Sequence, residues 1–159
     1  MNLKTLNDSL DRIPIKDLNK LKNIINSRKN ILILGNGGSN AISSHIAEDY
    51  TKALGKKAIS FSDAARLTCY INDYGMEQAY VKFIEHFAEN DTLVILISSS
   101  GNSKNIVNCA EFCKGKHDFV ILSGFEENNK LNQYKNQALI NFWIDSQDYG
   151  IVDITHLSI

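Results

Sequence analysis

Residues 31–39 have the sequence ILILGNGGS, in which four apolar residues are followed by a cluster of glycines. A short apolar run of this kind predicts a buried strand, and the glycines predict a tight turn after it. Beyond the turn, apolar residues recur every three or four positions as far as about Leu54, which predicts a helix with Ser39 as its N-cap. The stretch therefore predicts a strand, a glycine turn and a helix in succession.

The same succession continues along the chain. Further strands are predicted where short apolar runs recur, at 57–60, 92–97, 118–122 and 138–144. Helices are predicted around them, at about 63–71, 76–89, 103–114, 126–134 and from 148 onward. Strands that are apolar throughout and alternate with helices indicate a parallel sheet covered on both faces. We therefore predict an α/β fold, a doubly wound five-stranded parallel sheet flanked by helices.

Two more helical segments, 3–12 and 15–27, precede the first strand and are separated by Pro14. We assign residues 1–28 to an N-terminal helical extension and residues 29–159 to the α/β domain. No apolar run is long enough to span a membrane, and the amphipathic N-terminus is unlike a signal peptide. We therefore expect a cytoplasmic protein that has no membrane partner.

The composition narrows the range of functions. Of the 159 residues 43% are hydrophobic, and the formal net charge is −1, so no large basic surface is available to bind a nucleic-acid backbone. The three cysteines, Cys69, Cys109 and Cys113, form no CxxC pair, and we expect them to be reduced thiols, mostly in the core. Nucleic acid is not expected as a partner.

Two loops of small residues follow predicted strands and lead directly into helices: Gly35–Ser39 and Ser98–Ser103. In open α/β sheets, ligands bind beyond the carboxyl ends of the strands, where backbone N–H groups at helix starts attract anions. The second loop adds four serine hydroxyls within six residues, a donor density suited to a phosphate group. The alternative is that serine and glycine are simply common in loops.

Other phosphate-loop chemistries fit less well. The glycines are followed by Ser39-Asn40 and not by the Lys of a Walker A motif, which disfavours nucleotide triphosphate hydrolysis. The dinucleotide fingerprint is met only at Gly35 and Gly37, so no nucleotide cofactor is expected. No Gly-x-Ser-x-Gly motif is present to indicate a serine hydrolase.

Several titratable residues lie on the predicted helices. His45 and Asp49 are four positions apart on one helix face, a pair that could act as acid and base, share a metal ion, or be an ordinary exposed pair. The stretch 72–75, NDYG, is predicted to be a turn between helices. Asp153 and His156 are three positions apart on the last helix, and His156 could be catalytic or a helix-end residue.

The four motifs GNGGS, HIAED, INDYG and SSSGNS, taken in this order, resemble the sugar isomerase (SIS) family, and within it the phosphoheptose isomerases most closely. The resemblance implies that the serine loop holds the substrate phosphate and the first loop contacts the sugar. The substrate-binding residues it implies are Asn36, Gly37, Gly38, Asn72, Asp73, Ser98, Ser99, Ser100, Ser103 and Asp153. It further implies a zinc site at His45, Asp49 and Asp153, and catalytic roles for Asp49, Asp73 and His156.

The reaction implied by the resemblance is an aldose–ketose isomerisation of sedoheptulose 7-phosphate through an enediol, in lipopolysaccharide or capsule heptose synthesis. It also implies a homo-oligomer, a dimer or tetramer, with active sites at subunit interfaces. Three features depart from the family pattern. Asp49 stands where the family has Glu, and the N-terminal helical region looks shorter. Asp153 aligns with a Gln, and the family's last His falls beyond Ile159, so the last helix is expected to be truncated, with His156 as a substitute.

These departures keep a second function open: a catalytically weak SIS module that binds a phosphosugar or a protein partner, similar to the family's regulator that associates with the DnaA initiator. A nicotinamide-dependent enzyme is a distant third. The carboxylate at position 49 and the histidine of the last helix discriminate between the first two, because both share the phosphate loops.

Overall fold

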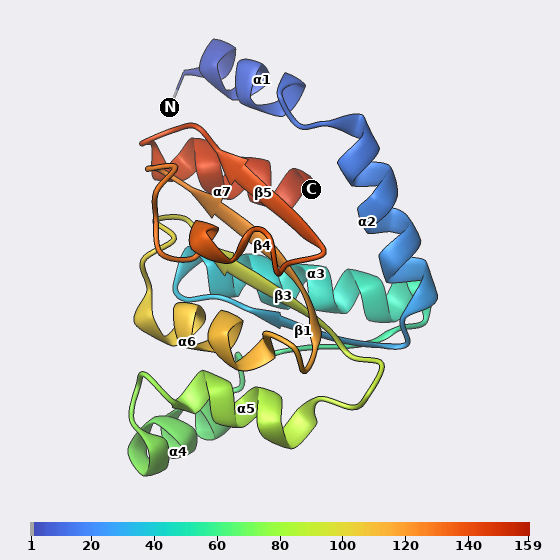
Figure 1. Ribbon diagram of the computed structural model, residues 1–159, viewed down its shortest axis with the longest axis vertical. Coiled ribbons are helices and arrows are strands. Elements are labelled where there is room, and N and C mark those ends of the chain that lie inside the picture. The colour runs from blue at the N-terminus through green and yellow to red at the C-terminus, as the bar shows by residue number, and fades with distance from the viewer. Residues whose placement is uncertain (1) are drawn as a thin grey trace.

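The computed structural model describes residues 2–159 and confirms the predicted fold class. The strands are parallel and form one sheet in the order β2-β1-β3-β4-β5, which is the doubly wound arrangement. Figure 1 labels β1, β3, β4 and β5 side by side in this order. The strands are β1 (Asn30–Leu34), β2 (Lys57–Ser60), β3 (Leu93–Ser98), β4 (Asp118–Gly124) and β5 (Ile140–Ile144). The helices are α1 (Leu3–Asp11), α2 (Ile15–Ser27), α3 (Gly38–Leu54), α4 (Ala64–Tyr74), α5 (Ala79–Phe87), α6 (Lys104–Cys113) and α7 (Tyr149–Ser158).

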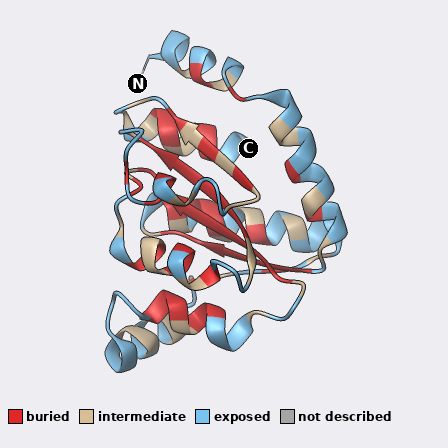
Figure 2. Cartoon of the chain, viewed as in Figure 1, coloured by how far each residue is buried: buried red, intermediate tan, exposed pale blue. Residues whose placement is uncertain are grey.

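The inner strands of the sheet, such as β1 and β3, are buried on both faces because nearly all of their side chains are apolar. In β1, Ile31 and Ile33 point into a core formed with α2 and α3, whereas Leu32 and Leu34 point into a core formed with α5 and α6. Figure 2 shows the strands buried almost throughout and the outer helix faces exposed. This two-sided burial is the physical reason for the continuous apolar runs in the sequence.

The N-terminal extension folds back onto the domain. The helix α2 packs its buried Leu21 and Ile25 into the core on the α3 side, and α1 contacts α7. Cys109 and Cys113 are buried and Cys69 is exposed, and all three are free thiols, as expected. Within residues 2–159, no helix is both long and apolar enough to cross a bilayer.

Three local predictions are wrong. The segment 126–134 is not a helix; only the 3-10 turn Asn132–Tyr134 forms there. Side chains replace helical bonds in this segment, because the Asn129 amide donates to the carbonyls of Gly124 and Glu126 and accepts from the backbone of Asn132.

The other two errors concern helix ends. Residues 72–75 are not a free turn, since α4 continues to Tyr74 and ends at Gly75, which has a positive φ of 75°. Gly37, and not Ser39, is the N-cap of α3, and Ser39 lies buried inside the first turn.

Candidate functional site

The two small-residue loops meet at the carboxyl ends of β1 and β3 and enclose a pocket of about 290 Å³. Tyr149 and Asp153 of α7 complete the wall of the pocket. The lining residues are Asn36, Gly37, Gly38, Ser39, Ile97, Ser98, Ser99, Ser100, Ser103, Tyr149 and Asp153. We call this the serine-loop pocket. The strand order makes β1 and β3 neighbours, so residues about sixty positions apart in sequence come together here.

The glycine turn between β1 and α3 needs its glycines for specific reasons. A Cβ on Gly35 would lie 2.7 Å from the backbone of Ser39, so only glycine allows the chain to turn this tightly. Gly37 has a φ of 54° at the N-cap of α3. The buried hydroxyl of Tyr80 donates to the carbonyl of Gly35 at 3.2 Å and supports the turn from below. The turn therefore directs the unpaired N–H groups of α3 toward the pocket.

The serine loop is shaped by Gly101, which has a φ of 64°. A Cβ at this position would collide with the side chain of buried Asn129. The backbone of Leu131 donates to the carbonyl of Gly101 at 2.8 Å, so the loop after β4 holds the far side of the serine loop. Ser98 donates to Ser103 across the loop at 3.3 Å, and Ser103 is the N-cap of α6. The loop thus presents several hydroxyls and a helix start to one point.

Two asparagines join the loops. The amides of Asn36 and Asn105 exchange two hydrogen bonds, each 2.9 Å long. Asn105 lies on α6 and is 4% exposed, so the pair is shielded from water and fixes the Asn36 side chain at the pocket. The sequence analysis did not identify Asn105. The sequence holds one signal for it, because Asn105 lies in the first turn of the helix that follows the serine loop, close to the expected phosphate position.

Asp153 is the acidic member of the pocket. It lies in the second turn of α7, a helix that is capped by Asp148 through hydrogen bonds from the backbone of Gly150 and Ile151. The Ser99 hydroxyl donates to Oδ1 of Asp153 at 2.5 Å, and Ser39 and Ser99 place their hydroxyl oxygens 3.4 Å apart. The expected binding residues of the two loops and Asp153 therefore share one pocket.

The rim carries an aromatic residue that the sequence analysis missed. Tyr149 is 61% exposed at the start of α7 and lines the pocket. Its ring meets that of Phe125 edge-on with centroids 4.6 Å apart, and Phe125 has a φ of 58°, rare outside glycine.

His45 and Asp49 lie outside this pocket. Their side chains are 63% and 54% exposed, and Nε2 of His45 is 3.4 Å from Oδ2 of Asp49. At a rise of about 1.5 Å per residue, Asp49 stands roughly 16 Å along α3 from Gly38. The pair therefore faces solvent and not the serine-loop pocket of the same chain.

Asn72 and Asp73 also lie elsewhere, on the exposed last turn of α4. The Asn72 amide donates to Asp73 at 2.9 Å, and the thiol of Cys69 lies 3.5 Å from the same carboxylate. Neither residue lines the serine-loop pocket.

His156 does not fit the role of an acid or base. The side chain is fully buried, and its Nε2 donates to the carbonyl of Ser123 at 3.2 Å. Burial lowers the pKa of His156 to about 4, so the ring is neutral near pH 7. Its position inward of Asp153 follows from the spacing, because three residues rotate a helix position by about 60° and advance it by about 4.5 Å.

The three expected zinc ligands are not assembled within one chain. His45 and Asp49 form a pair, but Asp153 is hydrogen-bonded to Ser99 in the pocket. Among residues 2–159 there is no group of three or more His, Cys, Asp or Glu side chains that could hold a metal ion. The set therefore does not fit a zinc ion in the isolated chain.

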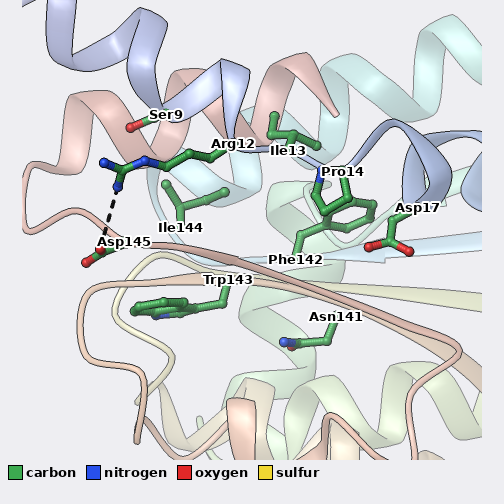
Figure 3. A pocket seen from close by; sticks show the side chains of 10 residues that line it. All are labelled: Ser9, Arg12, Ile13, Pro14, Asp17, Asn141, Phe142, Trp143, Ile144 and Asp145. Carbon is green, nitrogen blue, oxygen red and sulfur yellow. Dashed lines mark ion pairs between the residues drawn. The ribbon is translucent and has the colours of Figure 1, made fainter.

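A larger cavity of about 400 Å³ lies between the α1–α2 connection and β5 (Figure 3). Its walls include Ile13, Pro14 and Phe142. Two further lining residues, Arg12 and Asp145, form an ion pair at 3.6 Å. It contains none of the residues that the motifs identify and lies at the sheet edge, away from the loops after β1 and β3. We therefore take the smaller, hydroxyl-lined pocket as the candidate site.

Comparison with known proteins agrees with the geometry. The family described as the SIS domain matches residues 14–121. A phosphoheptose isomerase of Fusobacterium nucleatum is 40% identical over 102 residues, which are 61% of this chain and 53% of that protein. The match therefore spans about half the length of that relative.

A second relative matches over more of its length. The phosphoheptose isomerase of Helicobacter pylori is 31% identical over 161 aligned positions, covering 98% of this chain and 82% of that protein. Among solved structures, phosphoheptose isomerase from Neisseria gonorrhoeae has a TM-score of 0.84 at 18% identity, covering 98% of this chain and 87% of that one. At that identity the structural match supports the fold.

Proposed function

Because the chain belongs to the SIS domain family, we propose that it binds a phosphorylated sugar in the serine-loop pocket and isomerises it. The observation that carries the proposal is the meeting of the glycine turn and the serine loop in one pocket at the carboxyl ends of β1 and β3. Each loop alone would be an ordinary loop. Together they form a site with hydroxyl and backbone donors at one end and amide and carboxylate groups at the other.

The phosphate belongs at the serine loop. Ser98, Ser100 and Ser103 supply hydroxyls there, and the start of α6 supplies unpaired N–H groups and the positive end of the helix dipole. The sugar would then extend toward Asn36 and Asp153, whose polar groups can bind its hydroxyls.

The reaction we propose converts sedoheptulose 7-phosphate to D-glycero-D-manno-heptose 7-phosphate. A base takes the proton from C1, beside the carbonyl at C2, and the resulting enediol receives a proton at C2 while a second proton moves between the two oxygens. Binding the distant phosphate holds the reacting carbons in place. The product is a heptose that lipopolysaccharide or capsule synthesis could use.

The proposed acid and base residues call for more than one copy of the chain. Asp49 and Asp73 are exposed and outside the pocket, as a site shared between subunits requires. We propose a homo-oligomer in which these carboxylates reach a neighbour's pocket. Light scattering should give the mass of a dimer or tetramer, whereas a monomer at assay concentrations would contradict the shared site.

Turnover tests the isomerase assignment. Purified protein incubated with sedoheptulose 7-phosphate, with and without added Zn²⁺, should form the aldose, detected by NMR, and Asp49→Asn should lower the rate by at least about tenfold. The matched control is Glu48→Gln, a neighbouring exposed carboxylate on α3. Absence of aldose under both conditions would sink the assignment.

A second function, a phosphosugar-binding or regulatory module, is favoured by one observation. The histidine of α7 is buried and hydrogen-bonded to the backbone, so the described residues that line the pocket of a single chain include one carboxylate and no histidine. Binding of sedoheptulose 7-phosphate without turnover would select this function over the isomerase.

A further inference from the structure

We propose that Asp153 is a specificity-determining residue, which keeps free inorganic phosphate out of the serine-loop pocket while it accepts phosphate esters that carry hydroxyl groups. The inference rests on the proposed function only in that the serine loop binds phosphate. It adds a role that the loop motifs do not contain, because it depends on how α7 is docked against both loops.

The carboxylate occupies one hydroxyl donor of the serine loop that an anion would otherwise use. Oδ1 accepts the Ser99 hydroxyl at 2.5 Å, so the single proton of that hydroxyl is already committed. Oδ2 lies 2.7 Å from the position that a Cβ on Gly38 would take, so the carboxylate rests against the first residue of α3. Two independent elements, the serine loop and the start of a helix, thus already face a negative charge.

No positive side chain among the described lining residues offsets that charge. None of the described residues that line the pocket is Lys or Arg, and Asp153 is the one ionisable carboxylate among them. Because the carboxylate is hydrogen-bonded to Ser99 of the serine loop, a phosphate on that loop would lie close to it. At a separation of about 7 Å and a dielectric constant near that of water, the repulsion between a dianion and a carboxylate lowers the affinity by about tenfold.

A sugar phosphate can compensate where free phosphate cannot. Its hydroxyls are donors, and the second carboxylate oxygen, Oδ2, accepts no hydrogen bond from the described residues. Hydrogen bonds from neutral donors to a charged acceptor are among the stronger ones in proteins. The same carboxylate that repels the phosphate group therefore binds the rest of an ester.

The test measures inorganic phosphate binding by NMR titration or calorimetry in the full chain. Asp153→Asn keeps the side-chain shape and an acceptor for Ser99 but removes the charge, and it should bind inorganic phosphate about tenfold more tightly than the parent protein. Asp153→Ala is the second variant, and it should also bind phosphate more tightly. The matched control is Asp8→Asn, which removes the same charge from the exposed face of α1 and should leave the affinity unchanged.

Two further readings complete the test. Raising the salt concentration should shrink the gain of Asp153→Asn, because screening weakens charge repulsion. Sedoheptulose 7-phosphate should gain less than inorganic phosphate, or should lose affinity. Equal or weaker phosphate binding in both position-153 variants overturns the proposal. Absence of turnover in the parent protein, with the phosphate gain of Asp153→Asn intact, would count against the isomerase assignment alone.

Discussion

Three single residues have local environments that are unusual for their residue type. His156 is buried with a neutral ring, Gly101 lies in the turn of the serine loop against buried Asn129, and Asp153 brings a carboxylate to the serine-loop pocket. Each setting leads to a measurable property of that one residue.

His156 should make stability depend on pH. Its pKa is lowered from 6.5 to about 4 by burial, so the unfolded chain binds more protons than the folded chain between these values. Stability from this residue is full above about pH 6.5 and falls as the pH drops toward 4, by roughly 2–3 kcal/mol. Urea unfolding at pH 7.0, 5.5 and 4.5 should show the loss, and His156→Gln should show a smaller one.

The control for this experiment is His86→Gln, which removes an exposed histidine that is hydrogen-bonded to Tyr70. Its pH dependence should match that of the parent protein. If His156→Gln also matches the parent protein at every pH, the buried neutral ring is not the cause.

Gly101 and Gly115 form a natural pair for comparison. Both have positive φ, 64° and 73°, but a Cβ would collide with Asn129 at the first and would meet nothing within 4 Å at the second. Gly115→Ala should cost about 1 kcal/mol of stability from backbone strain, and Gly101→Ala clearly more, with loss of phosphate binding. Thermal unfolding and phosphate titration of both variants give the answer, and equal effects would contradict the crowded loop geometry.

At the scale of elements, the site depends on how α3, α6 and α7 are held against the end of the sheet. The Asn36–Asn105 pair joins the turn before α3 to the first turn of α6. The segment after β4 that contains Asn129 and Leu131 holds the serine loop from the other side, and α7 adds Asp153. The pocket is therefore a joint of several elements and not a property of one motif.

Removing the amide pair should weaken both stability and binding. Asn105→Ala leaves the Asn36 amide without its partner, which should cost about 1–3 kcal/mol of unfolding free energy. Because Asn36 then loses its fixed orientation, sedoheptulose 7-phosphate should bind roughly tenfold more weakly. The control is Asn108→Ala on the same helix, whose side chain donates to the carbonyl of Glu77 and does not line the pocket. Unchanged ligand affinity in Asn105→Ala would show that the pair is only structural.

The elements also show where sequence patterns are informative. The strand at 31–34 could be predicted because each of its side chains meets an apolar core, and Ser98–Ser103 could be located because the loop follows such a strand directly. The segment 126–134 could not, because asparagine side chains there bond the backbone in place of a helix. His156 does not line the pocket, and its spacing from Asp153 could not show this, because two residues three positions apart on a helix point in directions that differ by about 60°.

In the whole molecule, the proposed substrate-binding residues lie in one pocket, whereas the proposed acid and base residues lie on an exposed surface. The serine-loop pocket lies within one chain, whereas His45, Asp49, Asn72 and Asp73 lie on outer helix faces. Sequence motifs located all of these residues but could not give the distances between them, since those depend on how helices from separate parts of the chain pack. The proposed homo-oligomer is what would bring the two sets together.

The larger cavity is a second location at which a phosphosugar could bind. It lies beside β5 under the N-terminal helices, and among the described residues that line it Arg12 is the one with a positively charged side chain (Figure 3). The described residues that line the serine-loop pocket include no Lys or Arg, so a phosphate bound there would be held by hydroxyls and helix starts. Variants in the two cavities therefore separate the two locations cleanly.

The most direct measurement is calorimetric titration of sedoheptulose 7-phosphate into three proteins: the parent chain, the double variant Ser100→Ala/Ser103→Ala, and Arg12→Ala. We predict that the parent chain and Arg12→Ala bind equally well, and that the double variant binds at least about thirtyfold more weakly because it lacks two hydroxyl donors to a charged group. Binding that survives in the double variant but is lost in Arg12→Ala, or no binding by the parent chain, would contradict it.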